Sequence, residues 1–290
     1  MNSLLNRLKQ PLKQRLTSLN RKKRRWLNYV DSPDLFIKKS LAFLRHQKIK
    51  LLRNETTPAL FVYYNETLND RWIVESVFPG KTNGYFLEAG AANGKEASSC
   101  YVLEKALGWT GICVEPNDAF FEKLLRNRPN SICEKTCLAK QAGKVSYIEG
   151  SDNTIAPYLG GIKRNLATVK YGGNEIIKKG KLVEKDAITL EQLLDKHRAP
   201  SIIDYASFDI EGSELEVLED FPFRRYRFLA MSLECDGSIW KPITKLLRSN
   251  GYREVENPFN QDMPWERYWL HKSSYNSMEC MHFFREKKRF

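Results

Sequence analysis

The segment Tyr85–Gly94, YFLEAGAANG, constrains the fold of this chain more than any other stretch. Its apolar lead-in ends at Glu88, and two glycines with small residues between them follow, at Gly90 and Gly94. Glycine lacks a Cβ and tolerates positive φ, so a ligand can approach such a backbone closely. The unpaired N–H groups of a helix start would point into the same turn. The pattern predicts a buried strand that runs into a glycine-rich binding turn and then into a helix.

Strand-like and helix-like patterns alternate from Tyr85 onward, which predicts an α/β fold with a doubly wound, mostly parallel sheet. The predicted strands are Tyr85–Glu88, Gly111–Glu115, the segments Ser131–Leu138 and Lys144–Ile148, Tyr205–Ile210, Phe228–Glu234, Tyr252–Val255 and Arg267–His271. The predicted helices are Lys95–Leu107, Asp118–Arg126 with Asn117 as its cap, a helix that Thr189 caps and that reaches His197, Ser213–Leu218 and Ile239–Leu247. Cofactors related to nucleotides bind such sheets at the carboxyl ends of the strands, where the strand order switches.

The predicted domain organisation is one large α/β domain that follows an N-terminal extension. Its parts are a basic, partly helical arm at 1–53, a helical accessory region at 54–83 with a helix at Tyr63–Phe78, an α/β domain at 84–272 and a basic tail at 273–290. The stretch 150–181 is rich in glycine and lysine and shows little periodicity, so it is predicted to be a long loop. Such a loop is either a lid or substrate-binding loop, or a plain variable insertion.

The basic charge of the chain belongs to the arm. The net charge is +12, and residues 1–53 hold fifteen Lys/Arg against two acidic residues. Leucines at near-helical spacing and interfacial aromatics in residues 1–29 suit peripheral contact with an anionic membrane. A packed or solvated tail and a nucleic-acid contact remain the alternatives. No window approaches the roughly 18 apolar residues of a membrane span, and no signal-peptide core is apparent, so a cytoplasmic location with reduced cysteines is expected.

The acidic residue at the start of the turn separates two classes of cofactor. The dinucleotide fingerprint G-x-G-x-x-G faces a pyrophosphate, but Glu88 stands at its first position here. A carboxylate would repel a pyrophosphate, whereas it could bind the ammonium of a methionine moiety directly or through water. Charge complementarity therefore favours S-adenosyl-L-methionine. Glu115 ends the second predicted strand, before Pro116, and is the candidate for binding a ribose diol.

A second acidic group follows the later strands. Asp209 and Glu211 follow the strand Tyr205–Ile210, and Glu234 and Asp236 end the next strand. Because the first of these strands should lie beside the glycine turn, the carboxylates should face the reacting group. The alternatives are capping chemistry at two strand ends, or a divalent cation. No His joins the carboxylates, so a metal site is not predicted.

The ordered set of segments resembles the FkbM family of S-adenosylmethionine-dependent methyltransferases. The matching segments are FLEAGAANGKEASSCYVLEKALGWTGICVEPNDAFFEKLLRNRP, CLAKQAGKVSYI, DYASFDIEGSELEVLEDFPF and LAMSLEC. The resemblance implies a class I methyltransferase fold with a seven-stranded sheet, and transfer to oxygen on sugars or small natural products. It implies cofactor contacts from Glu88, Gly90, Ala91, Asn93, Gly94, Glu115, Pro116, Cys137 and Asp209, with the segment before Cys137 bordering the adenine.

The expected reaction follows from these residues. A hydroxyl acceptor must lose its proton at or after transfer, which a positioned carboxylate can accept. Asp209 is the first candidate for this base, and Glu211 or Glu234 the second. Three functions are compatible with the sequence: O-methylation of a sugar, glycan or natural product, methylation of RNA or protein gripped by the arm, and a catalytically inactive binding module.

Overall fold

The computed structural model describes residues 61–150, 159–167, 169, 173–235, 239–260, 263 and 265–277. The arm at 1–53 and almost all of the tail lie outside these residues, so the predictions for them stay predictions. Within the described ranges, no helix combines the length and the apolar character that a membrane crossing requires.

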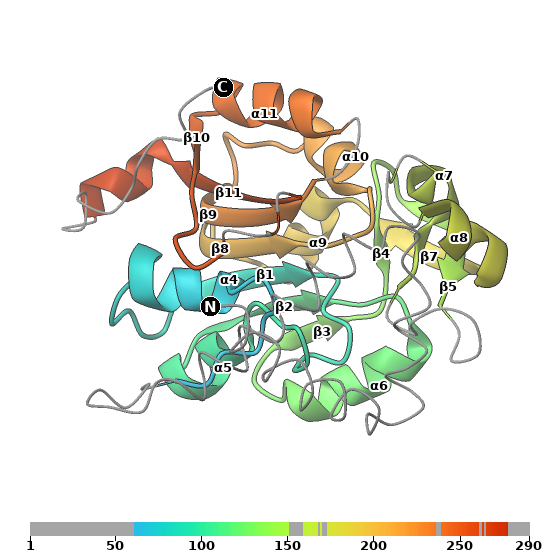
Figure 1. Ribbon diagram of the computed structural model, residues 1–290, viewed down its shortest axis with the longest axis horizontal. Helices are drawn as coiled ribbons and strands as arrows, with labels where there is room; N and C mark the ends of the chain where they lie inside the picture. The colour runs from blue at the N-terminus through green and yellow to red at the C-terminus, as the bar shows by residue number, and fades with distance from the viewer. Residues whose placement is uncertain are drawn as a thin grey trace, which may run out of the picture.

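A seven-stranded sheet forms the centre of the domain, in the order β10-β11-β9-β8-β1-β2-β3 (Figure 1). Its strands are β1 Tyr85–Ala89, β2 Thr110–Val114, β3 Ile132–Glu134, β8 Ile202–Phe208, β9 Arg227–Glu234, β10 Tyr252–Val255 and β11 Glu266–His271. All pairs from β3 to β9 are parallel, and β11 runs antiparallel to both of its neighbours. Because β1 lies between β2 and β8, the strand order switches at the glycine turn. This confirms the predicted doubly wound, mostly parallel sheet.

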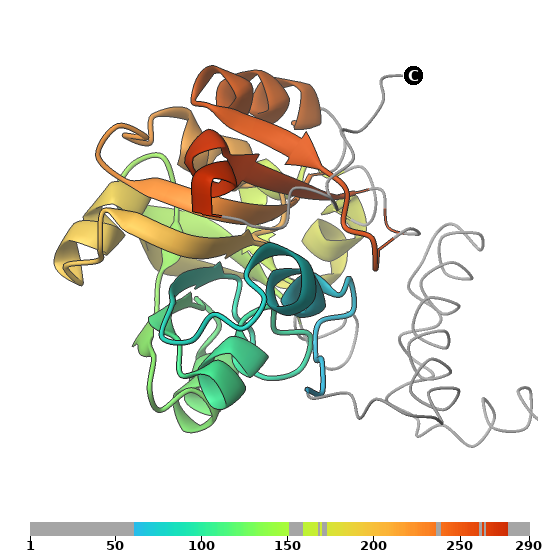
Figure 2. The same cartoon turned by 90° about the vertical axis from the view of Figure 1, so that its left-hand side faces the viewer.

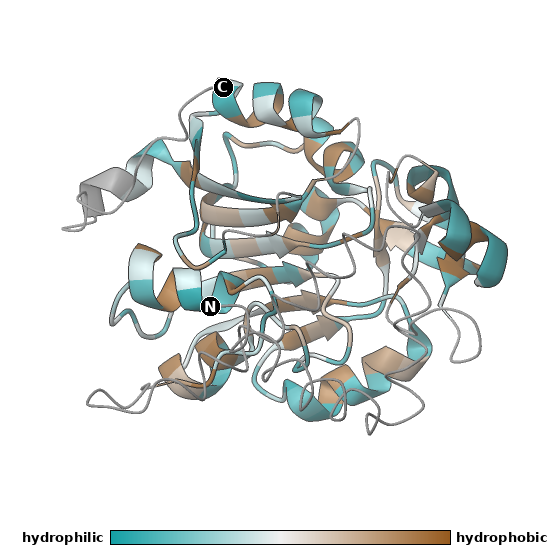
Figure 3. Ribbon diagram, in the orientation of Figure 1, coloured by the Kyte–Doolittle hydropathy of each residue, from teal (hydrophilic) through white to brown (hydrophobic). Residues whose placement is uncertain are grey.

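Helices cover both faces of this sheet (Figures 1 and 2). The alternation along β1 shows why two cores form: Leu87 and Ala89 face one core, and Phe86 faces the other. The first core is covered by α9 Leu190–Lys196, α10 Glu214–Glu219 and α11 Trp240–Ser249, and the second by α4 Asn69–Trp72, the π-helix η1 Ile73–Val77, α5 Tyr101–Leu107 and α6 Asp118–Asn127. A 3-10 helix, η2 Lys272–Ser277, follows β11. Apolar colour gathers on the central strands and polar colour on the outer helices (Figure 3).

A second, four-stranded sheet lies beyond the carboxyl ends of the main parallel strands (Figure 1). It consists of β4 Cys137–Leu138, β5 Gly143–Glu149, β6 Gly161–Ile162 and β7 Lys181–Ile188, with the helices α7 Lys163–Leu166 and α8 Gly173–Lys179 beside it. The predicted stretch Ser131–Leu138 therefore splits between two sheets. For its described part, the prediction of a loop at 150–181 is wrong. The helices there have four and seven residues, which is too short for a periodic pattern to show.

Two predicted helices begin later than the sequence suggested. The helix predicted from Lys95 starts at Tyr101, because Ala97 has a φ of 59° and the N–H groups of Ser99 and Cys100 donate to Glu88 instead. The helix predicted at Tyr63–Phe78 starts at Asn69, and continues as the π-helix η1. The other predicted elements lie within a few residues of their expected ends, and both predicted caps, Asn117 and Thr189, are confirmed.

Candidate functional site

The turn after β1 is held between the ends of its two neighbouring strands. The N–H groups of Gly90 and Ala91 both donate to the carbonyl of Val114, over 3.0 Å each. On the other side, the N–H of Asp209 donates to the carbonyl of Ala89 over 3.0 Å. Gly90 has a φ of 83°, and a Cβ on it would lie 1.9 Å from the carbonyl oxygen of Asp209. Only glycine fits where the turn passes the end of β8.

The last residues of the turn pack against helix α6. Gly94 has a φ of 74°, and a Cβ there would lie 2.7 Å from Cγ of Arg128. Asn93 uses its side-chain oxygen locally, where it accepts from the N–H groups of Lys95 and Glu96 over 3.0 and 2.9 Å. The side-chain oxygen of Asn93 thus helps to shape the turn, and the cofactor contact predicted for Asn93 stays a prediction.

Glu115 closes the turn from the side of β2. Its carboxylate is buried, and its two oxygens accept from the N–H groups of Ala92 and Asn117 over 2.8 Å each. Burial raises the pKa of this carboxyl group to about 7, although both hydrogen bonds act in the opposite direction. A carboxylate has about four lone-pair positions, so each oxygen can still accept from one ribose hydroxyl. Pro116 follows, half-buried, before α6.

The structure gives Glu88 a different role from the predicted one. Its buried carboxylate accepts from the hydroxyl of Ser98 and from the N–H groups of Ser99 and Cys100. Nη1 of Arg128 lies 2.8 Å from Oε2 of Glu88. Because protein donors already surround both oxygens, direct binding of a ligand ammonium by Glu88 is not supported. Glu88 instead fixes the segment that follows the turn.

Arg128 is the buried partner that sequence reasoning missed. Its Nε donates to Glu104 over 2.7 Å, and its Nη1 donates to the carbonyl of Gly94 over 3.3 Å as well as to Glu88. The guanidinium also lies 5.0 Å from the centroid of the Phe86 ring. A single arginine at the end of a surface helix carries no sequence signal of burial, so only the fold reveals this contact.

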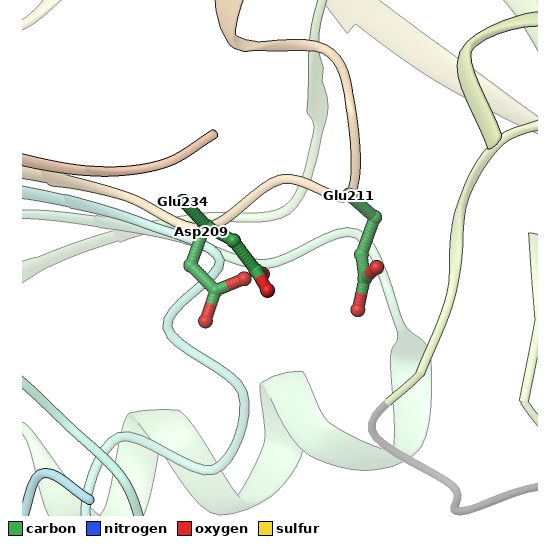
Figure 4. A group of neighbouring side chains, drawn as sticks. All are labelled: Asp209, Glu211 and Glu234. Atoms are coloured by element: carbon green, nitrogen blue, oxygen red, sulfur yellow. The ribbon is translucent and has the colours of Figure 1, made fainter. Parts of the chain in front are cut away.

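Three carboxylates meet at the ends of β8 and β9, beside the turn. Asp209, Glu211 and Glu234 each offer an oxygen within 4.8 Å of the others. Figure 4 shows Asp209 and Glu234 projecting side by side, and Glu211 facing the same space from the next loop. The structure therefore brings together the three residues predicted to be catalytic. Asp236 lies outside the described residues.

The surroundings of Asp209 make it a stronger proton acceptor than an ordinary aspartate. The side chain of Asp209 is exposed, yet desolvation by the surrounding protein raises its pKa well above the usual value. The nearby carboxyl groups of Glu234 and Glu211 raise the pKa of Asp209 further, because neighbouring negative charges repel. A raised pKa is what a general base that works near neutral pH requires. Oxygens at this spacing also suit a divalent cation.

A buried polar row crosses the sheet behind this cluster. The hydroxyl of Ser232 donates to that of Ser207 over 3.2 Å, and the amide of Asn69 donates to Ser232 and to Glu266 over 3.2 and 2.8 Å. Glu266 on β11 pairs with Glu234 on β9. Burial, and then the charge of Glu234, raise the pKa of Glu266 to about 8. A further carboxyl group, that of Glu266, therefore lies behind the carboxylate cluster and is protonated at neutral pH.

Glu266→Gln is expected to gain stability over the wild type as the pH rises from about 5 to about 8.5. The pKa of Glu266 is about 8 in the folded chain and lies near 4.5 without the fold. The folded state therefore holds the proton more tightly, and the wild type loses stability as the pH rises through this window. The gain between the two pH values should be about 4 kcal/mol, measured by urea unfolding at both pH values. Exposed Glu219→Gln is the matched control, and an equal effect of Glu266→Gln at both pH values would contradict the raised pKa.

The second sheet supplies another wall of the site. Cys137 is buried on β4, where burial and then the charge of Glu115 raise the pKa of its thiol to about 12. Tyr147 on β5, which sequence reasoning missed, is buried, and its pKa is raised by burial and then by the charges of Glu115, Cys137 and Glu211. Tyr147 therefore lies within reach of the charges of both Glu115 and Glu211. That the segment before Cys137 borders an adenine stays a prediction.

The residues at the turn fit a cofactor that carries a nucleoside. At Gly90 the turn packs so closely against the Asp209 carbonyl that only glycine fits, and Glu115 keeps acceptor positions for two hydroxyls. Both lie at the switch in strand order, where α/β sheets bind such ligands. These residues fit only the nucleoside end of the cofactor, because the carboxylate of Glu88 already accepts hydrogen bonds from protein groups.

Comparison with solved structures finds several methyltransferases of low sequence identity. The METTL16 methyltransferase domain aligns with a TM-score of 0.40 and 12% identity over 69% of this chain, which spans 65% of that domain's chain. Precorrin-6y C5,15-methyltransferase from Geobacter metallireducens aligns with a TM-score of 0.38 and 10% identity, over 74% of this chain and 91% of that chain. A TehB-like S-adenosylmethionine-dependent methyltransferase from Corynebacterium glutamicum aligns with a TM-score of 0.36 and 9% identity, over 80% and 97%.

Comparison with protein families is decisive. No curated protein gave a match to this chain. The methyltransferase FkbM domain matches residues 88–254, which is more than half of the 290 residues and includes the turn, Glu115 and the carboxylate cluster. The protein belongs to the FkbM family and is an S-adenosylmethionine-dependent methyltransferase.

Proposed function

We propose that this protein methylates a hydroxyl oxygen of a sugar, a glycan or a small natural product. The observation that carries the proposal is the position of Asp209. Its carboxyl group lies at the switch in strand order, its pKa is raised, and its backbone contacts the cofactor turn. A hydroxyl needs a proton acceptor at the point of transfer, and this carboxylate supplies one.

The residues around the site divide the work between holding the cofactor and removing a proton. When bound, S-adenosylmethionine supplies a methyl group that is already activated by the sulfonium. The turn at Gly90 and the carboxylate of Glu115 would hold the nucleoside end, and the protein would then align the acceptor oxygen for transfer. Asp209 would take the hydroxyl proton onto a carboxylate oxygen. Glu234 shares a hydrogen bond with Asp209, so the proton can be held between the two side chains.

The charge at the site favours an uncharged acceptor. Asp209, Glu211 and Glu234 converge there. A phosphate or carboxylate on the acceptor would meet repulsion at close range. A neutral hydroxyl would not, so a sugar ring or polyol suits the site better than a polyanion.

A second candidate function is methylation of RNA or of a protein. The observation that favours it is the basic arm at 1–53, which could grip an acidic polymer away from the site. The same arm supports contact of residues 1–29 with an anionic membrane from the cytoplasmic side.

Methyl transfer by the full chain separates these functions. The assay offers tritiated S-adenosylmethionine together with neutral monosaccharides and oligosaccharides, total RNA, or a protein mixture. We expect alkali-stable label on the sugars, as methyl ethers require. Label that appears only in RNA, with a rate that falls steeply as salt rises, would favour the second function. Cofactor binding without transfer to any acceptor class would support the binding module.

A further inference from the structure

Strands β2 and β3 place two cysteines side by side. Cys113 on β2 is the direct partner of Cys133 on β3 in the parallel register. Neighbouring strands lie about 4.8 Å apart, which falls within the Cα separation of about 4.4–6.8 Å that disulfides adopt. Both side chains face the core that α5 and α6 cover, and their thiols are hydrogen-bonded to each other. The five cysteines that the structure describes are all free thiols.

The two thiols have different environments. Cys113 is fully buried, whereas Cys133 lies on the edge strand of the sheet and is partly exposed. The hydrogen bond from Cys113, and then the charge of Arg128, lower the pKa of Cys133, while burial raises that of Cys113. In the described part of the chain, Nη2 of Arg128 is buried without a hydrogen-bond partner. The partly exposed thiol of Cys133 is therefore the one that reacts first as a nucleophile. The buried thiol of Cys113 lies beside it on the neighbouring strand.

The pair is directly connected to the cofactor turn. Val114, next to Cys113, accepts the hydrogen bonds of Gly90 and Ala91. The Cys133 thiol lies 3.9 Å from the carbonyl oxygen of Arg128, whose side chain holds Glu88 and Gly94. Closing the two sulfurs to the S–S distance of about 2.0 Å changes both side chains at the strand pair that holds the turn.

We propose that Cys113 and Cys133 form an oxidisable dithiol, and that closing it to a disulfide weakens cofactor binding at the adjacent turn. The oxidant is a peroxide. The Cys133 thiolate attacks one peroxide oxygen, an S–O bond forms, the O–O bond breaks, and hydroxide leaves. The Cys113 thiol then attacks the sulfenic sulfur, an S–S bond forms, and water leaves with the displaced oxygen and the Cys113 proton. Two thiols lose two electrons, and the peroxide is reduced to water.

Hydrogen peroxide treatment of the reduced full chain tests this proposal. We expect the intact mass to fall by two hydrogen atoms, and non-reducing peptide mapping to join the Cys113 and Cys133 peptides. Calorimetry with S-adenosylmethionine should show the dissociation constant rising about tenfold on oxidation and returning after dithiothreitol. Cys133→Ser should lose both effects and bind the cofactor as the reduced wild type does.

Two controls keep the test specific. Cys235→Ala removes a buried thiol in the other core and should still form the disulfide. Cys100→Ala removes the third thiol near Arg128 and should behave in the same way. A disulfide between other cysteines, or a stable sulfenic acid at Cys133 trapped by dimedone, would overturn the dithiol. A Cys113–Cys133 disulfide with unchanged cofactor affinity would overturn its link to the turn.

Discussion

Replacing Gly90 with valine is expected to abolish binding of S-adenosylmethionine. A Cβ at this position would lie 1.9 Å from the Asp209 carbonyl oxygen, a contact that no side-chain movement relieves because the obstacle is backbone. The turn must therefore move away from Val114 and Asp209, and it loses about three hydrogen bonds worth about 1 kcal/mol each. Their loss corresponds to a fall in affinity of roughly 100-fold or more, which calorimetry would measure.

A substitution at a second glycine, Gly80, shows whether the loss of affinity comes from the steric clash or from backbone strain alone. Gly80 also has a positive φ, 74°, but a Cβ there would have no atom within 4 Å. Gly80→Val therefore carries the left-handed strain of about 1–2 kcal/mol without any collision. It should lower the free energy of unfolding and leave cofactor affinity unchanged. Equal losses of affinity in both variants, or wild-type binding by Gly90→Val, would show that the turn does not form the cofactor site.

Asp209→Asn is expected to remove methyl transfer while cofactor binding persists. Asparagine keeps the size of the side chain and the backbone contact with the turn, but its amide cannot accept the hydroxyl proton. The rate should fall about 100- to 10,000-fold, the usual contribution of a positioned general base. The measurement is single-turnover transfer to the best neutral acceptor, with calorimetry on the same preparation.

The pH profile and a surface control identify the cause of this loss. Wild-type transfer should increase as the pH rises through the pKa of Asp209, at higher pH than for an ordinary aspartate, since desolvation and the neighbouring carboxyl groups raise that pKa. Exposed Asp220→Asn should keep full activity. If chelation by EDTA abolishes wild-type transfer, the cluster acts through a cation. Full activity in Asp209→Asn would show that another group accepts the proton.

Much of the fold could be predicted because local patterns and tertiary structure agree. The apolar strand before Glu88, the acidic residue at 115 and the strand before Asp209 each mark a strand end of a parallel sheet. These ends meet because the strand order switches at β1, so three distant segments converge as expected. The position of the turn, of Glu115 and of the carboxylate cluster follows from this topology.

The rest could not be predicted because it depends on long-range contacts. Glu88 carries a charge that suits a ligand, but Arg128, 40 residues later, is buried against it. The second sheet was missed because β4 and β6 have two residues each, and because β7 Lys181–Ile188 has one buried residue and charged residues at four of its eight positions. Tyr147 is an ordinary strand residue in the sequence, and only its packing brings it near both Glu115 and Glu211.

Calorimetric titration of the full chain with S-adenosylmethionine tests the central claim most directly. We predict saturable binding by the wild type at one site per chain, and a weaker interaction in Glu115→Gln, whose amide accepts poorly from a ribose diol. Exposed Glu219→Gln should bind as the wild type does. No binding by the folded wild type would contradict the assignment of the glycine turn as a methyl-donor site.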